Sequence, residues 1–271
     1  MYLVPRHIIL IPFFFQVILY RFMNLCYYLF MEILLDAPDY MVLNKPAGIS
    51  VHSDSVTEGD TMVSRVLAQF PELRDVGESF VVYPGGVPTA LPRAGIVHRL
   101  DRDTSGCLLV AKNEETFKYF KRQFQDRDVR KYYEAFVYGV PYPERGLIET
   151  PFGRSQRDAR LRTGRNPRGT VREAVTRYVV LKTFQNEGQT YSLIGLYPKT
   201  GRMHQIRVHM KHIQHPIVSD PLYGRGRPEA LDMKRVALHA RAITFTVRGG
   251  KEITCQAPYP TDFGQAIELT K

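Results

Sequence analysis

The sequence predicts an α+β domain in which a mixed, largely antiparallel central sheet is flanked by helices and loops. Short apolar segments with strand-like patterns dominate the chain after residue 31, and turn residues separate them. Only two segments repeat apolar residues at clear helical spacing, and no internal repeat is present. Many strands interrupted by two helices indicate an α+β fold.

The expected strands begin directly after residue 31. Two short strands lie within 32–47, around the Asp-Ala-Pro-Asp turn at 36–39. Residues 71–95 are rich in Pro and Gly and are expected to form a long surface excursion. The remaining expected strands are 95–101, 107–113, 131–139, 174–184, 190–198, 236–247 and 251–257.

The two expected helices are 60–70 and 113–128. The first follows an Asp or Thr cap, and its apolar face consists of Met62, Val63, Val66, Leu67 and Phe70. The second has Asn113 as its N-cap, and acidic residues follow it at the positive end of the helix. Its buried stripe consists of Phe117, Phe120 and Phe124.

Composition places the chain among globular proteins with a polyanionic partner. The 271 residues carry 37 Lys and Arg against 27 Asp and Glu, which gives a net charge of +10. This balance favours nucleic acid as a partner. The three cysteines have no paired spacing, which indicates a reducing compartment rather than a disulfide framework.

The first thirty residues differ from the rest. Residues 8–20 are apolar but interrupted by Pro12 and Gln16, and they are shorter than the roughly 20 residues of a membrane-spanning helix. No small-residue cleavage site of a signal peptide follows them. We interpret 1–30 as an extension outside the fold and 31–271 as the folded domain. Peripheral membrane contact of 1–30 is the alternative. Stable membrane insertion is not expected.

The segment HRLDRDTSGCLLVAK, 98–112, sets Asp101 between Arg99 and Arg102 at the end of an expected strand. Alternation along a strand places Arg99 and Asp101 on one face. Taken alone, the aspartate is most simply a turn residue whose carboxylate accepts hydrogen bonds from nearby amides.

This segment resembles the H-R-L-D-x-x-T-S-G signature of the RluA-type RNA pseudouridine synthases. Three further segments resemble motifs of the same family, in the same order. They are VLNKPAGISVH at 42–52, KYYEAFVYG at 131–139 and PKTGRMHQIRVHMKHIQHPIVSDPLYG at 198–224. With VALHA at 236–240, the resemblance covers roughly residues 33–262 and implies the pseudouridine synthase catalytic fold.

The resemblance implies isomerisation of uridine in RNA after the target base is flipped out of its stack. The reaction is redox-neutral, so no cofactor or metal is expected. Asp101 matches the essential aspartate, Arg207 the arginine that pairs with it, and Tyr133 the tyrosine that stacks on uracil and is the proposed proton acceptor. Arg99 matches the arginine that occupies the space left by the flipped base. The other RNA-binding residues expected are Arg202, His204, Arg160, Arg162 and Arg165.

Each assignment has a simpler structural alternative. Arg207 could be a solvated helix arginine, because Ile206, Met210 and Ile213 supply a buried face. The seven arginines of 154–172 could form a solvated loop, although we expect a basic arm that binds phosphates. The four histidines between 204 and 215 could suggest zinc, but the surrounding cations argue against a metal site.

Two other classes of protein compete with a synthase. The DRD sequence at 101–103 is similar to the D-x-D of haloacid-dehalogenase-type phosphatases, but His98 and Arg99 interrupt the strand that such a motif requires. A non-catalytic RNA-binding protein with the same fold is the other alternative, and the matches at Asp101, Tyr133 and Arg207 argue against it. We therefore expect a monomeric cytoplasmic enzyme that has no DNA partner. Its expected target is ribosomal RNA, with transfer RNA as the alternative.

Overall fold

The computed structural model describes residues 31–53, 59–83, 86–156, 161–165 and 167–271. The expected N-terminal extension, 1–30, lies outside these residues. Residues Glu32–Lys271 form one compact unit. Within the described part of the chain, no helix combines the length and apolar character needed to cross a membrane.

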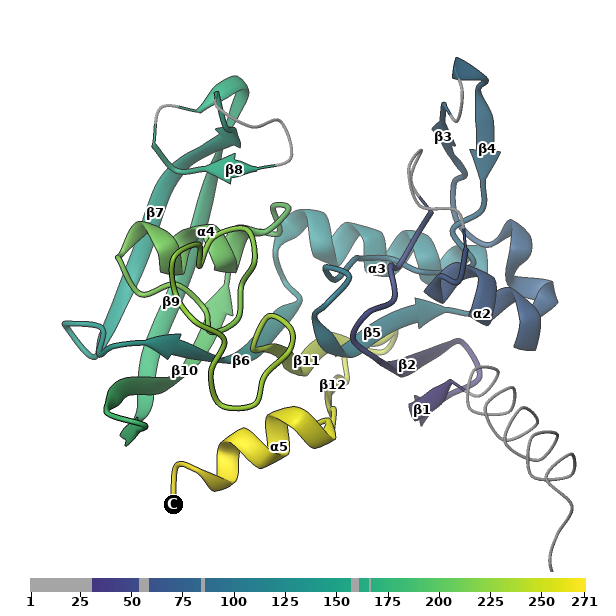
Figure 1. The fold of residues 1–271 in the computed structure, drawn as a ribbon. Helices are drawn as coiled ribbons and strands as arrows, with labels where there is room; N and C mark the ends of the chain where they lie inside the picture. Colours follow the sequence, from purple (N-terminus) through teal and green to yellow (C-terminus); the bar gives the residue numbers. More distant parts are fainter. Residues whose placement is uncertain (1–30, 54–58, 84–85, 157–160, 166) are drawn as a thin grey trace, which may run out of the picture. The chain divides into compact units, whose positions relative to one another are not determined.

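A mixed sheet of ten strands is the centre of this unit (Figure 1). Its order is β1-β2-β5-β11-β6-β10-β9-β7-β8, and β12 extends β11 on a branch off this path. All pairs are antiparallel except β5 with β11, which run parallel. The strands are β1 Glu32–Asp36, β2 Tyr40–Lys45, β5 Ser105–Ala111, β6 Arg130–Tyr138, β7 Arg145–Arg154, β8 Arg162–Thr163, β9 Arg168–Asn186, β10 Gln189–Pro198, β11 Leu238–Thr246 and β12 Glu252–Gln256. This arrangement confirms the predicted α+β class.

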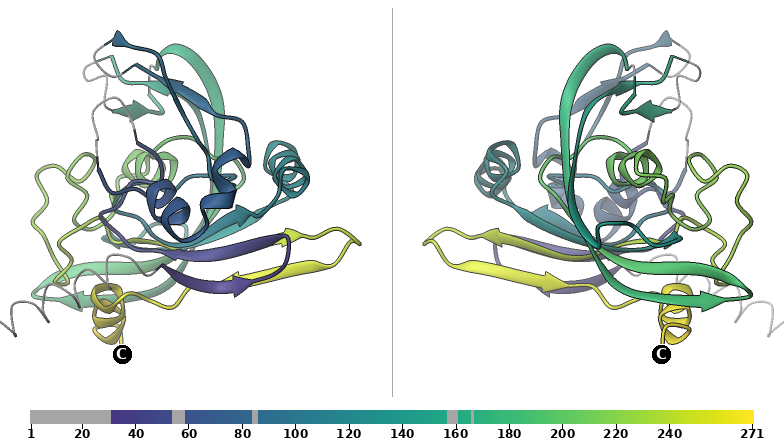
Figure 2. Two further views of the ribbon diagram at one scale, coloured as in Figure 1. Left: turned by 90° about the vertical axis from the view of Figure 1, so that its right-hand side faces the viewer. Right: turned by 90° about the vertical axis from the view of Figure 1, so that its left-hand side faces the viewer.

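Helices cover the sheet unequally. Three of them, with the 3-10 helix η1 Pro71–Asp75, lie on one face, and a C-terminal helix lies on the opposite face (Figure 2). The three are α2 Met62–Gln69, α3 Glu114–Asp126 and α4 Gln205–His212, and the C-terminal helix is α5 Thr261–Glu268. A separate hairpin, β3 Phe80–Val82 and β4 Thr89–Leu91, rises from the face that carries α2 and α3 (Figure 1).

Helix α3 forms as the sequence predicts and anchors the first half of the sheet. The Asn113 side chain accepts a hydrogen bond of 2.9 Å from the Thr116 amide and caps the helix. Phe117 and Phe120 are buried, and the Phe120 ring meets Phe245 of β11 edge to face at 5.2 Å. Aromatic packing therefore joins α3 to β11, and the two rings are 125 residues apart in the sequence.

The prediction of a strand at 95–101 is wrong. Only Ile96 pairs with the sheet, through an isolated bridge to Val110, and the following residues leave it. The reason is a side chain: the Leu109 amide donates a 2.9 Å hydrogen bond to Nε2 of His98, where a strand would offer a main-chain carbonyl. Asp101 therefore lies on a connection that runs free of the sheet until β5 begins at Ser105.

Several elements were not predicted. Strand β7 lacks a clear apolar pattern because only part of one face is buried, and polar residues and a proline interrupt it. The 71–95 excursion contains η1 and the β3–β4 hairpin, both too short to show periodicity. Helix α5 includes an internal glycine and has only two buried residues, so its pattern is weak.

Candidate active site

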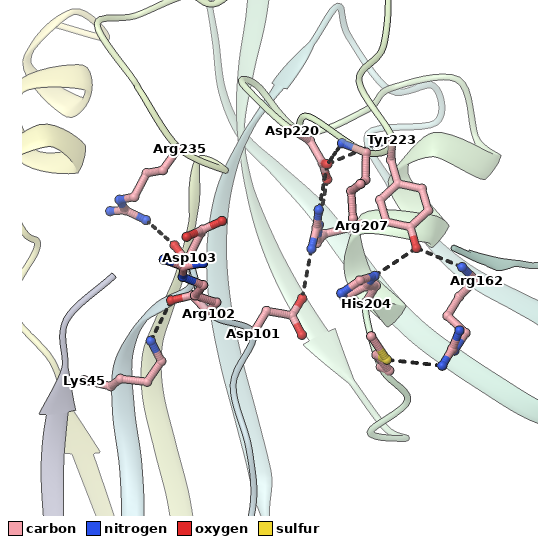
Figure 3. A network of polar contacts seen from close by, with 12 residues as sticks. Lys45, Asp101, Arg102, Asp103, Arg162, His204, Arg207, Asp220, Tyr223 and Arg235 are labelled. Carbon is pink, nitrogen blue, oxygen red and sulfur yellow. Dashed lines mark hydrogen bonds and ion pairs between the residues drawn. The ribbon is translucent and has the colours of Figure 1, made fainter. Parts of the chain in front are cut away.

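Asp101 lies in a turn whose main chain is held from both sides (Figure 3). The Thr104 amide closes the turn on the Asp101 carbonyl at 3.1 Å. Lys45 donates a hydrogen bond of 2.9 Å to the Arg102 carbonyl, and Arg235 donates one of 3.0 Å to the Asp103 carbonyl. The two carbonyls that follow Asp101 are thus fixed by cations from β2 and from the segment before β11.

Lys45 is fully buried beneath this turn. Its ammonium group donates to three carbonyls, those of Pro46 and Ile49 at 2.7 Å and that of Arg102 at 2.9 Å. Burial lowers the pKa of Lys45 to about 7, although the carboxylates of Asp103 and Asp101 partly oppose this shift. The lysine therefore connects the segment 42–52 to the Asp101 turn through hydrogen bonds.

Arg207 projects from α4 and contacts two carboxylates, one more closely than the other. Its Nε and Nη2 atoms donate to both oxygens of Asp220 at 2.7 and 2.8 Å. Its Nη1 atom reaches Asp101 at only 3.4 Å. Arg207 thus approaches Asp101 as expected, but its stronger partner is Asp220, whose side chain is completely buried.

Asp220 is itself oriented by the main chain. Its Oδ1 atom accepts hydrogen bonds from the amides of Leu222 and Tyr223 at 2.9 and 3.0 Å. The Tyr223 ring lies under the Arg207 guanidinium, 5.1 Å from its carbon. The guanidinium is therefore fixed at one edge by Asp220 and on one face by Tyr223, which leaves Nη1 to face Asp101.

The Tyr223 hydroxyl extends this network toward the basic segment. It accepts a 3.0 Å hydrogen bond from the Arg162 amide and lies 3.0 Å from Nδ1 of His204 (Figure 3). The Arg162 guanidinium contacts the Met203 sulfur at 3.3 Å. Residues expected to bind RNA at 162 and 204 are thus brought to the same site as Arg207.

A pocket of about 430 Å³ opens above Asp101, a size typical of small-molecule sites at roughly 300–1,000 Å³. Arg99, Tyr133, Arg202, His204 and Arg207 all line it. Burial, and then the charge of Asp101, raises the pKa of Tyr133 above its ordinary value. Its hydroxyl is therefore a neutral phenol at pH 7.

Tyr133 and its neighbour Tyr132 face opposite ways along β6, as alternation requires. The Tyr132 hydroxyl donates to Glu134 at 2.8 Å, and its ring packs 4.9 Å from Tyr197. Only Tyr133 lines the pocket. The expected division between a packing tyrosine and a site tyrosine agrees with this placement.

The arginines of 154–172 surround a second hollow of about 560 Å³, also in the size range of roughly 300–1,000 Å³ for ligand sites. Its basic lining consists of Arg154, Arg162, Arg168, Arg172 and Arg202. Arg202 and Met203 line both this hollow and the pocket above Asp101, so the two are adjacent. Arg165 is exposed nearby, and Arg160 lies outside the described residues.

The histidines that could suggest zinc contact different polar groups of the protein. His209 lies 3.1 Å from the Thr150 hydroxyl, and His215 lies 2.8 Å from the Tyr138 carbonyl. Across the described ranges, three or more His, Cys, Asp or Glu side chains do not converge on a common point.

Comparison with known proteins assigns the class. The sequence profile of a family described as RNA pseudouridylate synthase matches residues 39–212, which include the Asp101 turn, Tyr133 and Arg207. The chain belongs to this family of RNA pseudouridine synthases.

Curated relatives agree with this assignment. An uncharacterized RNA pseudouridine synthase of Chloroflexus aurantiacus is 42% identical over 81% of the chain and 63% of the relative. The protein named ribosomal large subunit pseudouridine synthase D in Neisseria meningitidis is 35% identical over 89% of the chain and 61% of the relative. The chain therefore spans about three fifths of the length of these two relatives.

Solved structures show the same fold. Human RNA pseudouridylate synthase domain containing 1 superposes with a TM-score of 0.67 at 25% identity, covering 86% of this chain and 85% of that one. Human RNA pseudouridylate synthase domain containing 4 gives 0.66 at 21% identity, covering 95% and 97%.

Sequence reasoning did not assign a role to three residues of this site. Lys45 lies within the segment 42–52, and Asp220 and Tyr223 lie within the segment 198–224. A signal was available for Lys45, because a lysine inside an apolar strand must find acceptors when buried. Asp220 and Tyr223 lie in a loop without periodicity, so only the folded structure connects them to Arg207.

Proposed function

We propose that the protein isomerises uridine to pseudouridine in structured RNA, with ribosomal RNA as its substrate. The observation that carries the proposal is the pocket that Asp101, Arg207 and Tyr133 line together. Relatives named for the large ribosomal subunit support the choice of RNA. The basic hollow beside the pocket supports a polyanionic substrate.

The target uridine would enter the pocket after leaving its stack, because its sugar cannot otherwise reach Asp101. The Asp101 carboxylate would then act on the nucleotide as a nucleophile or as a stabiliser of developing positive charge. Arg207, held by Asp220, would keep this carboxylate ionised and oriented. Arg99 is exposed at the pocket edge, where it could fill the space that the base leaves.

Tyr133 would stack on the uracil ring and serve the final proton transfer from carbon 5. A neutral phenol can take up that proton only if it passes its own proton onward, and the Asp101 carboxylate, which lines the same pocket, would receive it. The role of Tyr133 is therefore that of a relay, and Tyr133→Phe should bind RNA normally but stall after the new carbon–carbon bond has formed.

The test is tritium release from ribosomal RNA that is labelled at carbon 5 of uracil. Wild-type protein should release tritium in the presence of a chelator, whereas Asp101→Asn should release none. Hydrolysis of a phosphate does not displace the hydrogen at carbon 5, so a metal-dependent phosphatase would release no tritium at all. Absence of release with intact RNA binding would leave the non-catalytic alternative. Pseudouridine mapping of total RNA with and without the gene would then locate the target.

A further inference from the structure

A second pocket lies beside the one above Asp101, across a wall of four residues. It measures about 440 Å³, which is also within the roughly 300–1,000 Å³ of small-molecule sites. Residues 97–100 line both pockets, and Arg99 is exposed on this shared wall. A group bound in the second pocket would therefore be a close neighbour of a uridine above Asp101.

Aromatic rings form one side of the second pocket. The rings of His52 and Phe80 meet edge to face at 5.1 Å, and the Arg93 guanidinium carbon lies 5.3 Å from the Phe80 ring centre. Nδ1 of His52 is buried without a hydrogen-bond partner among the described residues. Because this atom has no exposed surface, a ligand in the hollow would meet the rings of His52 and Phe80 and not Nδ1 itself.

The charge of this pocket has one sign. Three arginines line it, Arg93, Arg99 and Arg102, and its lining contains no carboxylate. Arg93 and Arg102 each donate a hydrogen bond through Nε to a main-chain carbonyl, at 2.9 Å to Glu78 and to Gly48. These bonds hold both guanidinium groups at the pocket. Burial and the charges of Arg93 and Arg99 lower the pKa of His52 to about 4, so its ring is neutral and can offer one donor and one acceptor.

We infer that this pocket binds a second nucleotide of the same RNA, adjacent to the target uridine. Its base would lie against the rings of Phe80 and His52, and its phosphate would meet the arginines. The inference rests on the proposed function, because it places the second nucleotide relative to a uridine above Asp101. The chemistry combines stacking with phosphate neutralisation, which is how single-stranded RNA is bound.

The experiment uses fluorescein-labelled hexauridylate as the probe and measures its affinity by fluorescence anisotropy. Phe80→Leu, which keeps apolar volume but removes the aromatic face, should weaken binding by about 5- to 150-fold, the range for loss of one base–aromatic stack. Arg93→Gln should also weaken it and reduce its salt dependence. Val81→Ala is the matched control, because Val81 neighbours Phe80 on β3 but is exposed and does not line the pocket.

A cross-linking arm separates this inference from the proposed function. Hexauridylates that carry one 4-thiouridine at successive positions are irradiated with the full-length Asp101→Asn protein, and the modified peptides are sequenced. Cross-links to the Tyr133 peptide at one position and to the His52 or Phe80 peptide at a neighbouring position are expected. Cross-links to Tyr133 alone, with unchanged affinity in both variants, would overturn the second site and leave the proposed function. Absence of cross-links to either peptide would refute both the second site and the proposed function.

Discussion

Replacing Asp220 with Asn should destabilise the protein and slow the enzyme, although Asp220 does not line the pocket above Asp101. The carboxylate is completely buried and makes two charge-assisted hydrogen bonds to Arg207. Each such bond contributes about 1.5–3 kcal/mol, and breaking a buried ion pair costs about 3–5 kcal/mol in measured cases. We expect Asp220→Asn and Arg207→Met each to lower the free energy of unfolding by about 3–5 kcal/mol.

The double variant is the informative one. Once either charge is gone, removing the other relieves an unpaired buried ion. The double variant should therefore lose less unfolding free energy than the sum of the two single losses, by at least about 2 kcal/mol. Urea unfolding of the four proteins at pH 7 measures this difference. The pair Arg235–Asp262, at 2.7 Å but with Asp262 34% exposed, is the control cycle and should couple more weakly.

Turnover supplies an independent test of the same geometry. Asp220→Asn should lower the single-turnover rate because Arg207 loses the partner that directs its Nη1 atom toward Asp101. A lysine in place of Arg207 should rescue only in part, because it lacks the planar fork that engages Asp220 and Asp101 together. Additive stability losses, or an unchanged rate in folded Asp220→Asn, would refute the view that Asp220 positions Arg207.

Three further predictions follow from other contacts. Asp101→Asn should abolish tritium release while leaving the unfolding midpoint and RNA affinity near those of wild type; residual turnover would remove Asp101 from the chemistry. Because burial lowers the pKa of Lys45 from 10.5 to about 7, the unfolded chain binds more protons between these values and the lysine's contribution to stability rises with pH. The gap in unfolding free energy between wild type and Lys45→Met should therefore shift in favour of wild type by about 2 kcal/mol from pH 7 to 9, and parallel curves would contradict the burial argument. Arg168→Gln with Arg172→Gln should flatten the salt dependence of RNA binding by roughly one unit of log–log slope per lost phosphate contact, whereas Lys251→Gln, on the distant β11–β12 turn, should not.

The elements around the Asp101 turn show which features can be predicted from the sequence and which cannot. The apolar runs 107–113 and 131–139 predict their strands because buried strands need continuous apolar residues, and α3 is evident from its cap and phenylalanine stripe. The 95–101 strand fails because one histidine side chain takes the place of a carbonyl, which no periodicity reveals. The bidentate contact of Arg207 with Asp220 likewise depends on a loop whose path is set by tertiary contacts. The motifs of the sequence therefore indicate Asp101 as a partner of Arg207 but do not indicate Asp220.

The strand order has a consequence for when the site can exist during synthesis. Strand β11 lies between β5 and β6 in the sheet, although it follows both by more than a hundred residues. The strand after the Asp101 turn and the strand that bears Tyr133 therefore become neighbours only through β11, by its parallel pairing with β5 and its antiparallel pairing with β6. A ribosome must release residues 238–246 before these two side chains can face one pocket, so a nascent chain that has already made every residue from Lys45 to Asp220 still has no assembled active site.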